Sequence, residues 1–304
     1  MDLVGVPVET QWETMVGVAR RLEGAGYDSA WVYDHFHTVP EPTQEVTYEA
    51  WALMAALAAA TSTIRLGQMC TCNSYRPPSY LAKVASTVDV ISGGRLEFAI
   101  GAGWYEHEYL AYGYPFPRAS VRIGQLREAV EIIREMWLKD EATFDGTYYE
   151  VAGAINRPKP LQDPHPPLWI AGGGEKLTLR LVAEHADYAN FSGDLETFTA
   201  KSAILDDHCR AVGRDPAAVA RSLHMVLMVD ADDAAVARAA EQGGRPVDKY
   251  LASSMTVIGS ADRVGEQLAA YRDAGCTYFI LYFPDAVWGE SIEAFAERVM
   301  PSLR

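Results

Sequence analysis

The sequence has little of what marks secreted, nucleic-acid-binding or membrane proteins. Only four of its 304 residues are cysteine, and 26 Lys and Arg stand against 41 Asp and Glu, for a formal net charge of −15. Binding to nucleic-acid phosphates or to an anionic membrane surface needs clustered basic side chains, so we expect neither partner. The longest apolar run, near residues 51–60, is too short to cross a bilayer, and the N-terminus shows no secretory signal.

The cysteines do not suggest a disulfide framework or a metal site. Only Cys70 and Cys72 are close in sequence, and on a strand both side chains would face the same side, which is a poor disulfide geometry. No His or Cys follows them at zinc spacing. We therefore expect reduced thiols, no bound metal and a cytoplasmic protein.

Predicted strands alternate with predicted helices along the chain, a pattern that favours a parallel sheet built from βα units. Seven to eight such units in this length indicate an α/β protein with a (β/α)8 TIM-type barrel. A doubly wound open sheet is the alternative, weakened because no G-x-G-x-x-G follows the first strand. We expect one domain over residues 1–304, with an insertion at 143–167 that contains a proline-rich segment. The predicted helices are 12–24, 49–60, 80–91, 121–138 and 261–274, and the predicted strands are 29–33, 64–72, 96–100, 167–170, 222–229 and 278–283.

Asp34 and His35 directly follow the first of these strands. In a barrel, the chemistry lies at the C-terminal ends of the strands, and an imidazole exchanges protons near neutral pH. These two residues are therefore the catalytic candidates. The alternative is an ordinary polar loop that Asp34 caps.

Two further polar or glycine-rich turns follow predicted strands. Cys70, Thr71 and Asn73 end the strand 64–72, where short polar side chains suit hydrogen bonds to a ring; a plain turn is the alternative. Gly172, Gly173, Gly174 and Glu175 lie between a strand and a helix, and such a turn can hold a phosphate on free N–H groups.

A fourth stretch, Gly101-Ala-Gly-Trp-Tyr-Glu-His-Glu108, follows the strand 96–100. Its small residues let a flat group approach, and Trp104 and Tyr105 could stack on it. The acidic and histidine residues at 106–108 do not have metal-ligand spacing. We discount a metal there.

The segments VYDHFHTVP, CNSYRPPSYLAKVASTVDVISGGRLEFAIGAGWYEHEYLAYGYPFP and PPLWIAGGGEKLTLRLVAEHAD resemble the luciferase-like monooxygenase superfamily, and more narrowly its coenzyme F420-dependent oxidoreductase branch. The resemblance implies a barrel, usually a homodimer, with a deazaflavin ring across its mouth. It places His35 beside that ring, sets Thr71 and Asn73 against the cofactor, and assigns the phosphate to Gly172–Glu175. It also implies a non-prolyl cis peptide near Met69-Cys70.

The sequence departs from that family in two places. The first barrel strand is expected to be missing, or reduced to residues 3–6. Some deazaflavin dehydrogenases carry a catalytic Glu after the position of Gly103, where this chain has Trp104; a sugar-phosphate dehydrogenase activity is therefore not supported.

We thus predict an oxidoreductase that transfers a hydride between coenzyme F420 and a small organic substrate. The first alternative is an FMN-dependent monooxygenase that uses oxygen and receives reduced flavin from a partner reductase. The second is a non-catalytic flavin-binding relative. The substrate is not predicted.

Overall fold

The computed structural model describes residues 3–304, and the chain separates into two compact units. The larger unit comprises residues 30–189 and 205–219, and the smaller unit comprises the remainder. The expectation of one domain over 1–304 stays a prediction.

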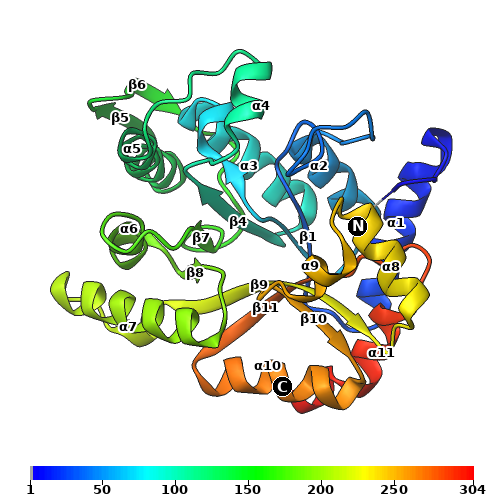
Figure 1. Ribbon diagram of the computed structural model, residues 1–304. Helices are drawn as coiled ribbons and strands as arrows, with labels where there is room; N and C mark the ends of the chain where they lie inside the picture. Colours follow the sequence, from blue (N-terminus) through cyan, green and yellow to red (C-terminus); the bar gives the residue numbers. More distant parts are fainter. Residues whose placement is uncertain (1–2) are drawn as a thin grey trace. The chain divides into compact units, whose positions relative to one another are not determined.

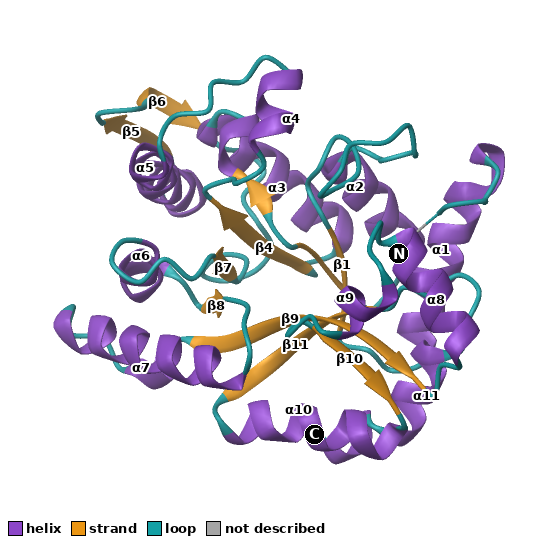
Figure 2. Cartoon of the chain, in the orientation of Figure 1, coloured by secondary structure: helices purple, strands orange, loops and turns teal. Residues whose placement is uncertain are grey.

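The larger unit is built on parallel strands, shown in Figures 1 and 2. Its strands follow the order β1-β2-β4-β7-β8, with β3 also paired to β4. The strand β4 is buried at every position, as expected for a central strand covered on both faces. Their bounds are β1 Ser29–Val32, β2 Arg65–Gln68, β3 Thr71–Cys72, β4 Leu96–Gly101, β7 Leu168–Ala171 and β8 Tyr188–Asn190.

Helices connect these strands, and their ends follow local sequence signals. Helix α3 begins with Pro78 in its first turn and ends at Gly93, whose φ of 71° lets its N–H reach back to the carbonyls of Asp89 and Val90. Helix α2 is capped by Glu49, whose carboxylate accepts from the Ala52 N–H. The helices are α2 Ala50–Ala60, α3 Pro78–Ser92, α4 Glu106–Ala111, α5 Ala119–Leu138, α6 Thr178–His185 and α7 Leu195–Ala211, with 3-10 turns at Asn73–Tyr75 and Pro216–Ala218.

The predicted strand over 64–72 is wrong as one continuous element. The Met69–Cys70 peptide bond is cis, as the family resemblance implied, and separates β2 from β3. Leu66 pairs with Leu96, but Thr71 pairs with Ile100, so this side of the ladder has one extra residue. Such a bulge redirects the side chains that follow it.

The predicted insertion holds an antiparallel hairpin of β5 (Glu141–Asp145) and β6 (Glu150–Ile155). The carboxylate of Glu128, on α5, accepts hydrogen bonds from the N–H groups of residues 147, 148 and 149 at the hairpin turn. The hairpin is therefore tied to the helix that precedes it.

The smaller unit places β9 (Ala220–Val229) between β10 (Thr256–Gly259) and β11 (Cys276–Tyr282), all parallel. Leu3 to Pro7 form no strand: the Val6 N–H bonds to the Leu3 carbonyl in a turn, so β1 is the first strand of the described residues. The expected reduced strand at 3–6 is therefore not found among the described residues. The helices of the smaller unit are α1 Val8–Gly24, α8 Asp233–Gln242, α9 Val247–Leu251, α10 Ala261–Asp273 and α11 Ser291–Arg298, with a 3-10 turn at Met300–Ser302.

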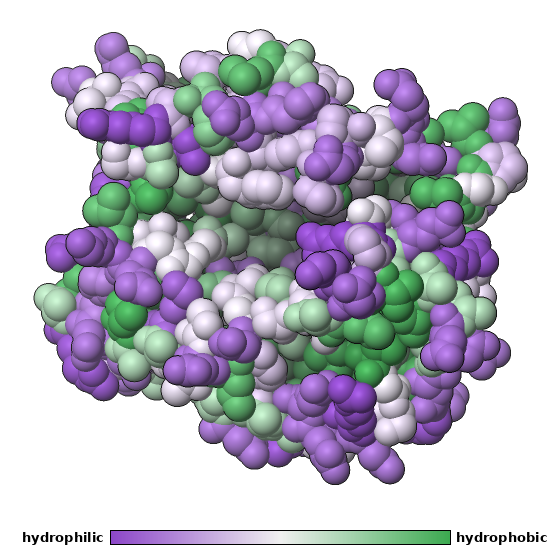
Figure 3. Space-filling model, viewed as in Figure 1, coloured by the Kyte–Doolittle hydropathy of each residue, from purple (hydrophilic) through white to green (hydrophobic). Residues whose placement is uncertain are grey.

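Charged and polar residues cover much of the face in Figure 3, with hydrophobic areas between them. Within residues 3–304, no helix combines the length and the apolar character that crossing a membrane requires.

Candidate active site

The predicted site residues lie at one edge of the sheet in the larger unit. Because β3, β4 and β7 run parallel, their C-terminal ends meet there: Cys72 pairs with Gly101, and Gly101 with Ala171. The Cys72 N–H donates to the Asp34 carboxylate at 2.9 Å, which joins the segment after β1 to the same edge. The alternation of strands and helices thus brings together residues that are far apart in sequence.

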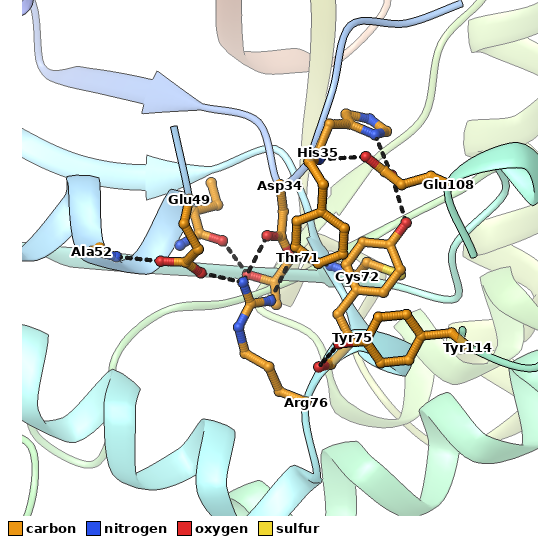
Figure 4. A network of polar contacts seen from close by, with 12 residues as sticks. Asp34, His35, Glu49, Ala52, Thr71, Cys72, Tyr75, Arg76, Glu108 and Tyr114 are labelled. Atoms are coloured by element: carbon orange, nitrogen blue, oxygen red, sulfur yellow. Dashed lines mark hydrogen bonds and ion pairs between the residues drawn. The ribbon is translucent and has the colours of Figure 1, made fainter. Parts of the chain in front are cut away.

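His35 is held by a carboxylate that the sequence did not single out. Its Nδ1 lies 2.9 Å from Oε2 of Glu108, on α4 (Figure 4). Glu108 is fully buried, and it also accepts from the Tyr75 hydroxyl at 2.5 Å and from the Phe36 N–H. Burial alone would raise the pKa of Glu108, but the hydrogen bonds that it accepts outweigh burial and lower that pKa.

Asp34 lies in a different set of contacts. Both of its carboxylate oxygens accept from the Arg76 guanidinium, at 2.7 and 2.9 Å, and Arg76 also pairs with Glu49. Burial by itself lowers the pKa of Arg76, but the contacts with Asp34 and then Glu49 outweigh burial and raise that pKa, so this cation stays charged. Asp34 is thus the partner of Arg76 in an ion pair, and Glu108, not Asp34, contacts Nδ1 of His35.

Polar residues at the end of β2 and just after it have buried polar atoms without hydrogen-bond partners. Thr71 donates to Oε1 of Gln68 at 2.6 Å, and Asn73 donates to the Tyr149 hydroxyl at 3.3 Å. Among the described residues, Nε2 of Gln68 and Oδ1 of Asn73 are buried and find no partner. An unpaired buried polar atom costs about 1–3 kcal/mol, so a polar ligand that reached these atoms would be stabilised by pairing with them.

The two nearby thiols are uncharged near neutral pH. Burial raises the pKa of Cys70 to about 12 and that of Cys72 to about 11. The hydroxyl of Tyr109 lies 3.1 Å from Sγ of Cys72. These thiols therefore behave as packing groups rather than as thiolates.

The glycine-rich turn after β7 is packed closely against the start of α6. A Cβ at Gly174 would lie 2.8 Å from Oγ1 of Thr178, and Gly172 has a φ of +127°, where side chains are strained. Nε2 of His208 lies 2.7 Å from the Glu175 carbonyl and can only donate to it. Lys176, exposed beside the turn, is the basic side chain nearest to it in sequence. Two other basic side chains already have partners: Arg76 is bound to Asp34, and Lys83 donates to the Arg157 carbonyl.

Aromatic side chains surround His35. The ring centroids of Tyr33, Trp104 and Tyr105 lie 5.4, 6.0 and 6.2 Å from that of the imidazole. Tyr33 is 40% exposed and Trp104 is 61% exposed. Aromatic rings inclined by 55°, 77° and 74° to the imidazole therefore border it.

Sequence reasoning missed two of these residues, Glu108 and Gln68. The sequence drew attention to Glu108 only as one of the residues 106–108, where a metal was discounted. In the structure α4 buries Glu108 and Tyr109, while Glu106 and His107 are exposed, so the three side chains of 106–108 do not form one cluster. His107 instead pairs with His37, with Nδ1 and Nε2 3.3 Å apart. Gln68 showed no signal, because an amide inside an apolar strand has many uses.

Parallel strands with a polar, partly unsatisfied site at their C-terminal ends define an α/β enzyme of the barrel class. Residues 4–251 match the family model of luciferase-like monooxygenases, and the chain belongs to this family. The predicted fold class and the predicted resemblance are thereby confirmed.

Particular relatives agree with this assignment. The chain is 28% identical to an F420-dependent glucose-6-phosphate dehydrogenase of Amycolatopsis mediterranei, over 95% of this chain and 94% of that protein. It is also 28% identical to pyrimidine monooxygenase RutA of Acinetobacter baylyi, over 93% and 85%. A solved F420-dependent secondary alcohol dehydrogenase, in complex with an F420-acetone adduct, superposes with a TM-score of 0.85 at 25% identity, covering 97% and 96%. The prediction that the chain is an oxidoreductase enzyme is confirmed.

Proposed function

We propose that this enzyme uses coenzyme F420 and transfers a hydride between it and a small organic substrate, with His35 as the catalytic residue that takes or gives the proton. The observation that carries the proposal is the imidazole at the ends of parallel strands, fixed through Nδ1. The similarity to F420-dependent relatives over nearly the whole chain supports the choice of cofactor.

The residues present fit such a cofactor. The unpaired buried atoms of Gln68 and Asn73 offer one donor and one acceptor to a heterocyclic ring, and Cys70 and Thr71 lie on the same segment. The turn Gly172–Glu175 precedes the first turn of α6, where backbone N–H groups attract a phosphate. Exposed Lys176 adds a positive charge beside it.

When bound, the deazaflavin accepts or gives a hydride. The role of His35 is then to take up or to give the proton that accompanies the hydride. In alcohol oxidation the hydroxyl proton passes to the imidazole as the C–H bond breaks and the carbonyl forms. In carbonyl reduction a protonated His35 gives its proton to the carbonyl oxygen as the hydride adds to the carbonyl carbon.

The surroundings of His35 argue against a sugar phosphate as substrate. Trp104 stands where some dehydrogenases of this family carry a catalytic Glu, and aromatic rings border the imidazole. Arg76, the cation beside Asp34, is already paired. We propose an uncharged substrate with an apolar part.

Titration of the purified protein with oxidised F420 and with FMN, followed by fluorescence, tests the cofactor. We expect F420 to bind at micromolar concentration or tighter, and at least tenfold more tightly than FMN. The same deazaflavin without its phosphate-containing tail is the matched control for the Gly172–Glu175 turn, and should bind at least tenfold more weakly. A preference for FMN would move the enzyme to the oxygen-using monooxygenases served by a partner reductase, and binding of neither would favour a non-catalytic relative. The homodimer remains a prediction, which light scattering would test.

A further inference from the structure

Glu108 makes contacts with His35 on two sides. Oε2 lies 2.9 Å from Nδ1 of the imidazole, and Oε1 accepts from the N–H of Phe36, the next residue in the chain. The carboxylate therefore binds both the ring and the backbone that carries it. Tyr75 donates to Oε2 from another direction at 2.5 Å (Figure 4).

The chemistry of these contacts decides which imidazole nitrogen carries hydrogen. An ionised carboxylate can only accept hydrogen bonds, and the lowered pKa of Glu108 keeps it ionised near neutral pH. Nδ1 of neutral His35 must therefore be the protonated nitrogen. Nε2 then carries the lone pair, and no hydrogen bond or ion pair to Nε2 is found among the described residues.

We propose that Glu108 is the positioning residue of this site: it fixes His35 in the Nδ1–H tautomer, so that Nε2 is the atom that exchanges the proton with substrate. The consequence for catalysis rests on the proposed function, but the tautomer does not. The tautomer can be measured on the free protein, without cofactor or substrate.

The substitution Glu108→Gln makes a sharp test because the Phe36 N–H can only donate. It requires the amide oxygen of the glutamine on its side. The amide NH2 then faces His35 and Tyr75, in place of the oxygen that accepted from them. Nδ1 must become an acceptor, and the proton moves to Nε2. Size and hydrogen-bond count are kept while the tautomer is inverted.

The experiment is long-range 1H–15N NMR of protein labelled in histidine, recorded above pH 8. In wild type we expect the His35 signal of an Nδ1–H tautomer, and in Glu108→Gln that of an Nε2–H tautomer. Glu106→Gln, an exposed neighbour on the same helix, is the matched control and should leave the tautomer unchanged. A wild-type Nε2–H tautomer, or an unchanged tautomer in Glu108→Gln, would overturn the proposal.

Turnover then separates this proposal from the proposed function. We expect Glu108→Gln to lower kcat about 10²–10⁴-fold with KM within about threefold, because neutral His35 can no longer accept a proton at Nε2. An inverted tautomer with unchanged kcat would uphold the positioning by Glu108 and reject proton transfer by His35. If Glu108→Gln does not fold, Tyr75→Phe keeps the test open: it removes one donor to Oε2, and the Nδ1–H tautomer should persist, whereas its loss would contradict the role of Glu108.

Discussion

Two buried carboxylates lie at the same edge of the larger unit, and their partners differ. Asp34 pairs with a guanidinium, which keeps its charge at every physiological pH. Glu108 pairs with an imidazole, a group that can take up or release a proton. A permanent pair can only hold structure, whereas a pair with a titratable member can also hold or release a proton. We therefore propose a structural role for Asp34 and a chemical role for His35.

The difference also explains how neighbouring residues in one loop can serve two purposes. The Asp34 carboxylate accepts from the Cys72 N–H and from Arg76, and thereby fixes the loop to β3. With the loop held in this way, His35 can remain partly exposed: its side chain is 16% accessible, against 1% for Asp34.

The sharpest way to break the comparison is to remove the imidazole. His35→Ala should lower turnover of the best substrate from a screen of enones, imines and alcohols by about 10²–10⁴-fold. Binding of F420, measured by fluorescence, should stay within about threefold, because the imidazole is not among the residues proposed to hold the cofactor. Unchanged turnover would remove His35 from the mechanism.

Asp34→Asn tests the other carboxylate. We expect a loss of about 3 kcal/mol in the free energy of unfolding, the lower end for a broken buried pair, because Glu49 still contacts Arg76. Urea denaturation gives this value, and turnover per folded molecule should stay within a few-fold of wild type.

The matched control is Asp140→Asn, which breaks the exposed pair with Arg157 and should change stability by less than about 0.5 kcal/mol. Equal losses in the two variants would mean that the buried pair contributes no more than a surface pair. A large loss of turnover in folded Asp34→Asn would instead return Asp34 to the chemistry.

A smaller effect is expected at His185, a histidine whose Nδ1 faces a cation. Nδ1 lies 3.0 Å from a guanidinium nitrogen of Arg134, which can only donate. Burial, and next the charge of Arg134, lower the pKa of His185 from 6.5 to about 4. The unfolded chain binds a proton that the folded chain does not, so this contribution to stability is complete above pH 6.5 and is lost as pH falls toward 4.

The amide oxygen of His185→Gln can still accept from Arg134. From pH 7 to pH 4.5 we expect the free energy of unfolding of this variant to fall by about 2 kcal/mol less than that of wild type. Urea midpoints at several pH values measure this difference, and the values near pH 8 serve as the internal reference. Identical pH dependence in the two proteins would show that folding does not lower the pKa of His185.

Part of the site could be read before the fold was known, because strand ends in a parallel α/β protein meet at one edge. The positions of Asp34, His35, Thr71 and the Gly172–Glu175 turn follow from that rule. The rule does not say which acid meets which base. Asp34 is next to His35 in sequence, yet the contact with Nδ1 comes from Glu108, 73 residues further along the chain.

The same division holds for the fold. The periodic alternation of apolar strands and amphipathic helices by itself determined the fold class, because each element must bury one face against its neighbours. The break between β2 and β3 was not visible in the residue pattern, since a strand with an extra residue has the same composition as one without; only the family resemblance pointed to Met69-Cys70. Only the tertiary structure decided the partners of the buried charges, because an ion pair depends on which side chains the packing of distant segments brings within about 3 Å, and sequence spacing does not encode that distance.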